Sequence, residues 1–227
     1  MDRDQLVDAV RMLTAAGILD YNGHASVRTG PDRLLINSGR SVRSHLSAAD
    51  LVEIDLDGQP AGPGDAPPLE FHIHAEIYKR RPDVHAVVHG HPKWSTVLSV
   101  AGVRHAPVYA QGTLLGDVPL FAGKLSVNTA SAGAALADAL GAGRAVVLQS
   151  HGTVVVGADL VEAFALALYL EDNAERQYLA RQIGQPVVFT QAEQEACRSN
   201  LWKPNLFRKA WDHQRASLSG SGPLKTP

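Results

Sequence analysis

Two histidines at the end of an apolar run have the residue types and the spacing of metal ligands. His89 and His91 follow residues 84–88, which are mostly valine and alanine. Alternate residues of a strand point to the same face, so the two imidazoles lie about 7 Å apart along the backbone. Two imidazoles in this arrangement can chelate a divalent cation, and the cation offsets the cost of removing them from water. The run therefore predicts a metal site.

Two further residues complete a ligand set. Glu70 opens a segment with helical spacing, and His74 lies on the same face four residues later. We expect Glu70 to reach the metal and His74 to stand behind it as a hydrogen-bonding group. His151 follows a second buried strand, residues 144–149, and Gly152 lets the backbone turn and aim the ring. The predicted metal ligands are His89, His91, His151 and Glu70. Three imidazoles and a carboxylate suit Zn²⁺, and Mn²⁺, Co²⁺ or Fe²⁺ also fit.

The remaining histidines and the single cysteine predict no chemistry. His45, His105 and His213 stand outside any such pattern, and His85 lies at the mouth of its strand, where we expect exposure to solvent. Cys197 is the only cysteine, so no internal disulfide forms, and we expect it to pack in a helix. A reducing cytoplasm is the simplest compartment for such a chain.

Composition excludes several classes of function. The 227 residues carry a net charge of −2 and are 45% hydrophobic, which predicts one large globular domain. Lysine and arginine are dispersed, which gives no sign of nucleic-acid binding. No run approaches about 18 apolar residues, so we expect no membrane span.

The elements that must position these residues alternate between helical and extended patterns. Helices are predicted over residues 4–16, 70–79, 94–100, 126–140 and 159–183. Strands are predicted over residues 25–28, 33–36, 51–55, 84–89, 118–121, 144–149 and 153–156. Several strands are adjacent with short connections, which favours a mixed or antiparallel sheet flanked by helices. We expect a domain over residues 1–216, with 58–68 an internal loop, and a flexible tail over 217–227.

Three segments resemble the class II aldolase/adducin family, and the resemblance covers about residues 5–180 in order. They are residues 70–74 (EFHIH) with Tyr78 and 81–83 (RPD), residues 86–91 (AVVHGH), and residues 148–152 (LQSHG). The resemblance implies an α/β fold, an α/β/α sandwich with a mainly antiparallel central sheet. It also implies a homotetramer with active sites at subunit interfaces. The family's metal ligands match the four residues already predicted, and its acid/base glutamate matches Glu70.

The same resemblance places an anion-binding pocket in residues 22–28 and 37–39. Glycines with small hydroxyl and amide groups allow backbone N–H groups to close on an anion. The predicted substrate-binding residues are Asn22, Ser26, Arg28, Ser38 and Gly39. For Arg28, a bidentate pair with a substrate carboxylate and a salt bridge inside the fold are both open.

Three residues are candidates for proton transfer in catalysis. Glu70 comes first because it can lie beside the metal, and His24 lies in the predicted pocket. Tyr109 falls where the aldolases keep a tyrosine acid, but the correspondence over residues 101–117 is loose. The alternative interpretation is that Tyr109 is a half-buried tyrosine of a strand with no catalytic role.

The chain departs from the sugar-phosphate members of the family just before Glu70. Those members have two hydroxyl residues there, which help to hold the phosphate, whereas this chain has Pro68 and Leu69. Proline has no N–H and leucine no hydroxyl, so at least two hydrogen bonds to a phosphate are missing. Together with His24, this pocket suits a flatter substrate that carries carboxylates.

The motifs look more like the decarboxylases of the family, which act on acids such as 3,4-dihydroxyphthalate or on ring-cleavage products in aromatic catabolism. The sequence therefore predicts a metal-dependent carbon–carbon lyase that decarboxylates a hydroxylated aromatic (di)carboxylate. The alternatives are a sugar-phosphate aldolase or epimerase, such as a fuculose-phosphate aldolase, and a non-catalytic adducin-like interaction domain. In the C-terminal region, Trp202, Phe207 and Trp211 either close over a substrate ring or, as we favour, pack against a partner chain.

Overall fold

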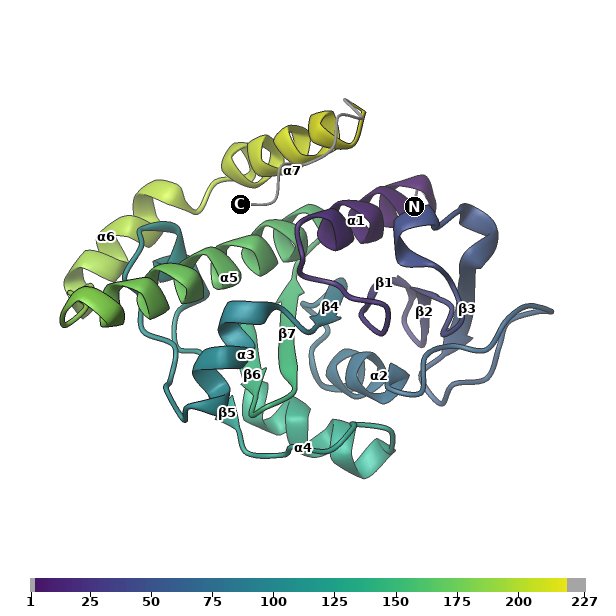
Figure 1. Cartoon of the computed structure of the whole chain (residues 1–227). Helices are drawn as coiled ribbons and strands as arrows, with labels where there is room; N and C mark the ends of the chain where they lie inside the picture. Colours follow the sequence, from purple (N-terminus) through teal and green to yellow (C-terminus); the bar gives the residue numbers. More distant parts are fainter. Residues whose placement is uncertain (1–2, 220–227) are drawn as a thin grey trace.

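A computed structural model describes residues 3–219 and places a seven-stranded sheet between two layers of helices (Figure 1). The helices are α1 (Arg3–Ala15), α2 (Phe71–Arg80), α3 (Lys93–Val100), α4 (Ala130–Leu140), α5 (Leu160–Ile183), α6 (Gln191–Leu201) and α7 (Pro204–Ser219). The strands are β1 (His24–Gly30), β2 (Arg33–Asn37), β3 (Leu51–Asp55), β4 (Ala86–Gly90), β5 (Leu120–Phe121), β6 (Ala145–Leu148) and β7 (Gly152–Gly157).

The strand order is β3-β2-β1-β4-β7-β6-β5, and every pair in the described part of the chain is antiparallel except β5 with β6. The α/β/α fold with a mainly antiparallel sheet, which the sequence predicted, is confirmed. The predicted edge strand is β5, and residues 58–68 form the expected loop within the domain.

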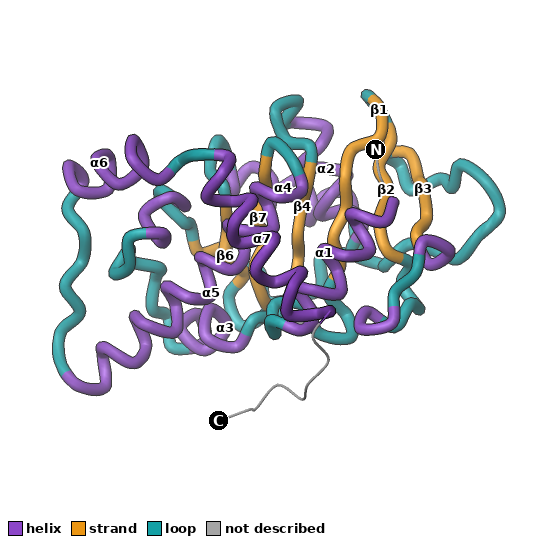
Figure 2. Tube along the Cα trace, turned by 90° about the horizontal axis from the view of Figure 1, so that it is seen from above, coloured by secondary structure: helices purple, strands orange, loops and turns teal. Residues whose placement is uncertain are grey.

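Both faces of the sheet are buried, and alternate residues of a strand belong to different cores. Val88 of β4 packs in the core that α1, α5 and α7 cover, whereas Val87 packs in the core that α2 and α4 cover. Figure 2 shows α1, α5 and α7 lying across one face of the strands. Each buried valine or leucine side chain contributes about 1.5–3 kcal/mol through the hydrophobic effect. Because the alternation has a period of two, His89 shares the face of Val87 and points toward α2.

Two glycines allow the close packing that brings the ligand-bearing segments together. A β-carbon at Gly90 would collide with the backbone carbonyl of Ile18, and one at Gly152 would collide with the carbonyl of Gly90. The glycines in the two His-Gly motifs are therefore needed for steric reasons at the crossing of β4 with its neighbours.

The beginnings of two helices test the predicted boundaries. Asp159 caps α5 by accepting a hydrogen bond from the Glu162 N–H at 2.8 Å, so the helix starts within one residue of its predicted boundary. Helix α4 begins at Ala130 rather than at residue 126, so the predicted start is wrong. Thr129 caps this helix, and the preceding residues stay outside it because two of them bind a carboxylate of the site described below.

Cys197 lies in helix α6, as expected, but the sequence did not predict the bounds of α6 or the existence of α7. Trp211 is 1% exposed, and its ring lies 5.0 Å from that of Phe164 on α5. The rings of Trp202 and Phe207 lie 5.3 Å apart, and Arg144 stacks on Trp202. The aromatic residues therefore pack against their own chain, which corrects the expectation of a partner chain. Helix α7 includes the first three residues of the predicted tail, and residues 220–227 lie outside the described part. No helix between residues 3 and 219 has the length and apolar character to cross a membrane.

Candidate active site

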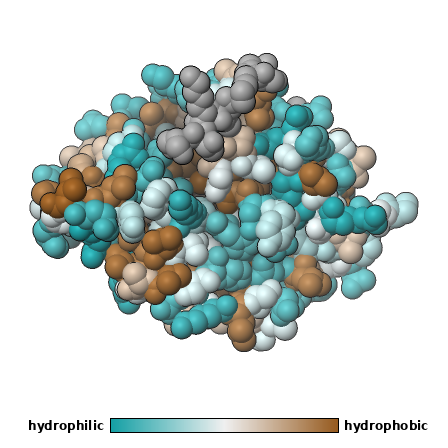
Figure 3. Space-filling view, viewed as in Figure 1, coloured by the Kyte–Doolittle hydropathy of each residue, from teal (hydrophilic) through white to brown (hydrophobic). Residues whose placement is uncertain are grey.

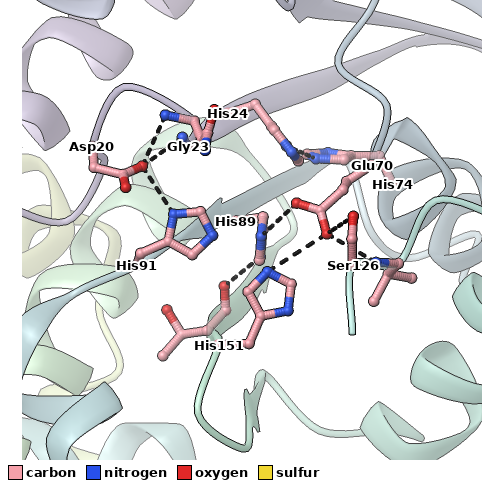
Figure 4. A network of polar contacts seen from close by, with 12 residues as sticks. Asp20, Gly23, His24, Glu70, His74, His89, His91, Ser126 and His151 are labelled. Carbon is pink, nitrogen blue, oxygen red and sulfur yellow. Dashed lines mark hydrogen bonds and ion pairs between the residues drawn. The ribbon is translucent and has the colours of Figure 1, made fainter. Parts of the chain in front are cut away.

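The four predicted metal ligands converge at one end of β4. Glu70 stands at the N-terminus of α2, His89 lies in β4 and His91 directly follows it, and His151 lies in the turn from β6 to β7 (Figure 4). One ligand atom from each residue lies within 4.8 Å of the ligand atoms of the others. The structure thus brings together four side chains that are up to 81 positions apart in the sequence, from Glu70 to His151.

Hydrogen bonds to the far nitrogens orient two of these imidazoles. His89 Nδ1 lies 3.0 Å from the Thr153 carbonyl, and His91 Nδ1 lies 2.9 Å from Asp20 Oδ1. Each contact fixes the proton on Nδ1 and leaves Nε2 as a lone-pair donor, the arrangement usual for metal-binding histidines. His89 is fully buried, and within residues 3–219 its Nε2 makes no hydrogen bond. A buried nitrogen without a partner is costly, and a cation among the four ligands would satisfy it. The donor set therefore fits a divalent metal.

Hydrogen bonds from the segment before α4 hold Glu70 in place. Its Oε1 accepts from the Ser126 hydroxyl and the Val127 N–H, both at 2.9 Å. Its Oε2 lies 3.4 Å from His89 Nε2, and its Oε1 lies 3.5 Å from His151 Nε2. Burial acts to raise the pKa of Glu70, but the contacts with His89 and with the Val127 N–H outweigh burial and hold the pKa well below its ordinary value. Glu70 is therefore ionised and suited to bind a cation.

A strained turn aims His151 at the other ligands. Ser150 is the one residue other than glycine, among residues 3–219, with a positive φ, at 58°. Its N–H donates to the Ser99 hydroxyl at 3.0 Å, which holds this left-handed conformation. Burial is the main cause that lowers the pKa of His151 to about 4. The ring is therefore neutral near pH 7 and available as a ligand.

A buried chain of hydrogen bonds supports His24. His24 Nδ1 lies 2.7 Å from His74 Nε2, and His74 Nδ1 lies 2.6 Å from the Ser26 hydroxyl, which is 2.9 Å from the Tyr78 hydroxyl. Burial raises the pKa of Tyr78 strongly, so Tyr78 keeps its proton. In the direction in which every proton has an acceptor, Tyr78 donates to Ser26, Ser26 to His74, and His74 to His24. This direction leaves a hydrogen on His24 Nε2, the other ring nitrogen.

Burial is the main cause that lowers the pKa values of both histidines, that of His24 well below its ordinary value and that of His74 to about 3. His24 is therefore a neutral donor in a fixed orientation. The predicted support by His74 exists, but His74 supports His24, not Glu70.

Two adjoining cavities surround the ligand set. One, of about 380 Å³, is lined by Asp20, Asn22, Glu70, His91, Lys124, Ser126, Ser150 and His151. The other, of about 360 Å³, is lined by Asn22, His24, Gly39, Arg43, Pro67, Pro68, Leu69, Glu70 and Ser126. They share Asn22, Glu70 and Ser126, so a ligand in the second cavity lies beside the metal ligands in the first. A larger hollow of about 670 Å³, near η3 (Gln111–Leu115) and α6, contains no predicted site residue.

Three of the predicted substrate-binding residues lie at or beside these cavities. Asn22 lines both cavities, and Gly39 lines the second. Ser38, next to Gly39, is fully buried, and its hydroxyl has no hydrogen-bond partner between residues 3 and 219. The two loops that the sequence assigned to the pocket therefore reach it, although only some of their side chains do.

Ser26 and Arg28 do not line either cavity, which corrects the prediction that they contact substrate. The Ser26 hydroxyl is occupied by His74 and Tyr78. The Arg28 guanidinium donates to four backbone carbonyls at 2.6–3.2 Å, and it stacks on the Tyr78 ring. Arg28 lies four residues beyond His24, about 13 Å along the strand, which places it away from the cavities. Its partners are backbone carbonyls, so it makes neither a substrate contact nor a salt bridge. Its hydrogen bonds link β1 to the last turn of α2 and to the loop that leads into β4.

The structure does not bring Tyr109 to the ligand set within one chain. Its N–H donates to the Asn173 side chain at 3.1 Å, and Arg176 stacks on its ring at 4.2 Å. Neither cavity includes it. A role for its hydroxyl would therefore need a second copy of the chain.

Sequence reasoning missed three contributors to the site. Asp20 orients His91, Ser126 binds Glu70, and Arg43 lines the second cavity. None of them belongs to a motif or a periodic pattern, because each acts on a residue or a cavity that only the folded chain brings near. The only sequence signal for Asp20 was its position as an isolated acidic residue just before Asn22 and Gly23.

A family model described as Class II Aldolase and Adducin N-terminal domain matches residues 4–178. The chain is 29% identical over 231 residues to a 3,4-dihydroxyphthalate decarboxylase of Terrabacter sp. (strain DBF63), with 96% of this chain and 97% of that protein covered. It is 33% identical over 195 residues to a 5-methylthioribulose-1-phosphate/5-deoxyribulose-1-phosphate aldolase of Rhodospirillum rubrum, with 85% and 87% covered. An L-fuculose 1-phosphate aldolase structure from Glaciozyma antarctica PI12 superimposes with a TM-score of 0.84 at 23% identity, over 96% of this chain and 88% of that one.

Proposed function

Because the chain belongs to the class II aldolase and adducin family, we propose that it is a divalent-metal-dependent carbon–carbon lyase, and specifically a decarboxylase of a hydroxylated aromatic dicarboxylate. The observation that carries the proposal is the convergence of three histidines and Glu70 beside a cavity whose outer wall is Pro67, Pro68 and Leu69. These three residues are apolar and offer no side-chain donor for a phosphate, so the side-chain donors of the cavity are confined to Asn22, His24, Arg43 and Ser126. The similarity to a 3,4-dihydroxyphthalate decarboxylase over nearly the whole length of both chains supports the same substrate class.

The ligand set would hold the cation through the imidazoles of His89, His91 and His151 and the carboxylate of Glu70. We propose Zn²⁺, with Mn²⁺, Co²⁺ and Fe²⁺ as the other ions that this donor set accepts. A divalent cation supplies Lewis-acid stabilisation of the negative charge that develops on a substrate oxygen.

The protein residues then have to place the substrate and deliver one proton. The carboxylate ortho to the phenolic hydroxyl is lost: its bond to the ring breaks, CO₂ leaves, and the electron pair stays on the ring carbon. A proton must then reach that carbon. Glu70 is ionised in the free protein, so it acts as donor only after it takes a proton from the substrate hydroxyl. His24 holds an N–H beside the same cavity and can donate to a substrate oxygen.

The other predicted members of the site have defined places in this proposal. Asn22, Ser38 and Gly39 would bind the polar groups of the substrate, since the two loops that carry them reach the cavities. Tyr109 stays a predicted proton donor only across a contact between subunits, which the single chain does not contain.

Assays on the purified, metal-loaded protein test the proposed function. We expect release of CO₂ from 3,4-dihydroxyphthalate, with 3,4-dihydroxybenzoate as the product, and no cleavage of L-fuculose 1-phosphate. Aldehyde release from a ketose phosphate without any CO₂ release would refute it.

The second candidate, a sugar-phosphate aldolase or epimerase, is favoured by the 33% identity to the Rhodospirillum rubrum aldolase. The same ligand set serves both chemistries, because an enediolate and a ring carbanion need the same stabilisation. A non-catalytic adducin-like domain would not need the four ligands. A metal content near zero after purification without chelators would favour that alternative.

We also propose that the enzyme is a cytoplasmic homotetramer, as the resemblance implies. Exposed apolar side chains gather on α3 and at the end of α5, among them Val100 (64% exposed), Ile183 (92%) and Val187 (87%). Figure 3 shows apolar patches over this side of the molecule. Such surfaces are typical of contacts between subunits. A molar mass near 97 kDa by light scattering, four times the 24.2 kDa of one chain, is the expected result.

A further inference from the structure

Arg43 is a buried cation without a direct ion pair, and the charge of Asp20 acts on it from beyond ion-pair distance. It is 4% exposed, and no carboxylate among the described residues lies within ion-pair distance of it. Its Nε donates to the Gly23 carbonyl at 2.8 Å, and its Nη1 donates to the carbonyl and hydroxyl of Ser41 and, at 3.4 Å, to the Gly39 carbonyl. Burial lowers the pKa of the guanidinium, but arginine keeps its charge in proteins. A buried charge of this kind is costly unless an anion joins it.

One edge of this guanidinium is left for a ligand. The Nη2 atom makes no hydrogen bond to any residue between 3 and 219, and Arg43 lines the 360 Å³ cavity with His24, Asn22 and Glu70. His24 adds a second feature, because its Nε2 is buried in the same wall without a partner. A cation and a fixed N–H thus face a cavity that adjoins the metal ligands across Glu70.

We propose that Arg43 binds the carboxylate that the substrate retains, so that the enzyme selects aromatic dicarboxylates over monocarboxylates. The inference rests on the proposed function for the identity of the substrate, but the recognition by Arg43 is a separate property. One carboxylate lies at the metal ligands and is lost, while the other pairs with Arg43 and fixes the ring between them. The arginine that the sequence had assigned to this task, Arg28, is occupied elsewhere in the fold.

The walls of the cavity favour a carboxylate over a phosphate monoester. The free Nη2 of Arg43 and the Nε2–H of His24 match the two oxygens of a carboxylate, whereas a phosphate dianion has three terminal oxygens and needs further donors. Pro67 and Pro68 have no N–H to add, and the exposed side chain of Leu69 offers a flat apolar contact to a ring.

The test measures binding, so that it does not depend on turnover. Phthalate and benzoate, neither of which has the phenolic hydroxyl, are titrated calorimetrically into the metal-loaded wild-type protein, Arg43→Gln and Arg43→Lys. The matched control is Arg40→Gln, because Arg40 is exposed and pairs with Asp65 at 3.3 Å. Inorganic phosphate is titrated as the competing class of anion.

In the wild type we expect phthalate to bind about 10- to 100-fold more tightly than benzoate, as one hydrogen bond to a charged group allows. Arg43→Gln should remove this preference, Arg43→Lys should keep part of it, and Arg40→Gln should leave it intact. Equal affinities in the wild type would overturn the proposal even if Arg43→Gln failed to fold. A preference unchanged in Arg43→Gln, or tighter binding of phosphate than of phthalate, would overturn it as well. Absence of CO₂ release, with the phthalate preference intact, would refute only the proposed reaction.

Discussion

Substitution of Glu70 by glutamine separates metal binding from proton transfer. The change keeps the shape of the side chain and removes its charge. The amide oxygen can still accept from Ser126 and Val127, which hold the present Oε1 at 2.9 Å. The amide NH₂ then takes the place of Oε2, which lies 3.4 Å from His89. The variant therefore presents a hydrogen-bond donor where the wild type presents a ligand.

The hydrogen bonds and the chemistry give the expected magnitudes. A hydrogen bond to a charged group contributes about 1.5–3 kcal/mol, against about 0.5–1.5 kcal/mol for a neutral one. Weakening the two bonds to Oε1 therefore costs about 2 kcal/mol, part of which is offset because a buried charge is no longer present. The protein should stay folded and still bind metal through three imidazoles. Removal of an acid/base group typically lowers turnover about 10²- to 10⁴-fold.

The assay compares metal content and turnover at saturating metal. We expect Glu70→Gln to hold close to one metal per chain, measured by competition with a chromophoric chelator, while the rate of CO₂ release falls by at least two orders of magnitude. Ser126→Ala removes one hydrogen bond to the carboxylate and should give a smaller loss. Glu53→Gln, the same exchange on the edge strand β3, should keep wild-type turnover. A fully metallated Glu70→Gln with near-normal turnover would disprove the proton-transfer role.

Four further predictions follow from the same contacts. His89→Ala and His151→Ala should each lose metal and activity together, and one metal per chain in either variant, measured by elemental analysis, would contradict the ligand assignment. Asp20→Ala should weaken metal binding about 10- to 100-fold by releasing the His91 ring that Asp20 orients, which a competition titration checks; an unchanged affinity would remove this residue from the site. Burial lowers the pKa of His74 from 6.5 to about 3, so between these values the unfolded chain takes up a proton that the native state does not. The unfolding free energy of the metal-free protein should therefore rise with pH over this window, by up to about 1.4 kcal/mol per unit, and urea titrations should show a flatter profile in His74→Gln. Trp211→Ala should cost about 3–5 kcal/mol of stability by thermal or urea unfolding; a loss below about 1 kcal/mol would mean that α7 is not part of the core.

The family resemblance and the structure agree on the ligands but differ on the substrate contacts. Asn22, His24 and Gly39 of the two predicted loops line the cavities, whereas Ser26 and Arg28 are engaged in hydrogen bonds of the fold. Which residue of a loop faces a cavity depends on the register of β1 against β4 and on the path of α2 beneath it. A motif predicts which loop contributes to the pocket, whereas packing determines which side chains of that loop are free to contact a ligand.

The sequence by itself determined the sheet, most of its helices and the identity of the four candidate metal ligands that converge in the fold. These follow from local patterns: a period of two in the strands, a period of 3.6 in the helices, and His-Gly pairs in which a larger residue would collide with a neighbouring segment of the same chain. Only the tertiary structure decided that Asp20 orients His91, that Ser126 holds Glu70 and that Arg43 faces the cavity. Asp20 lies 71 positions from His91, and Ser126 lies 56 positions from Glu70, so no local period relates the partners. Arg43 lines a cavity that exists only in the folded chain. Contacts of this kind exist only after folding has brought distant segments side by side, because no local repeat of the chain places the two partners near each other.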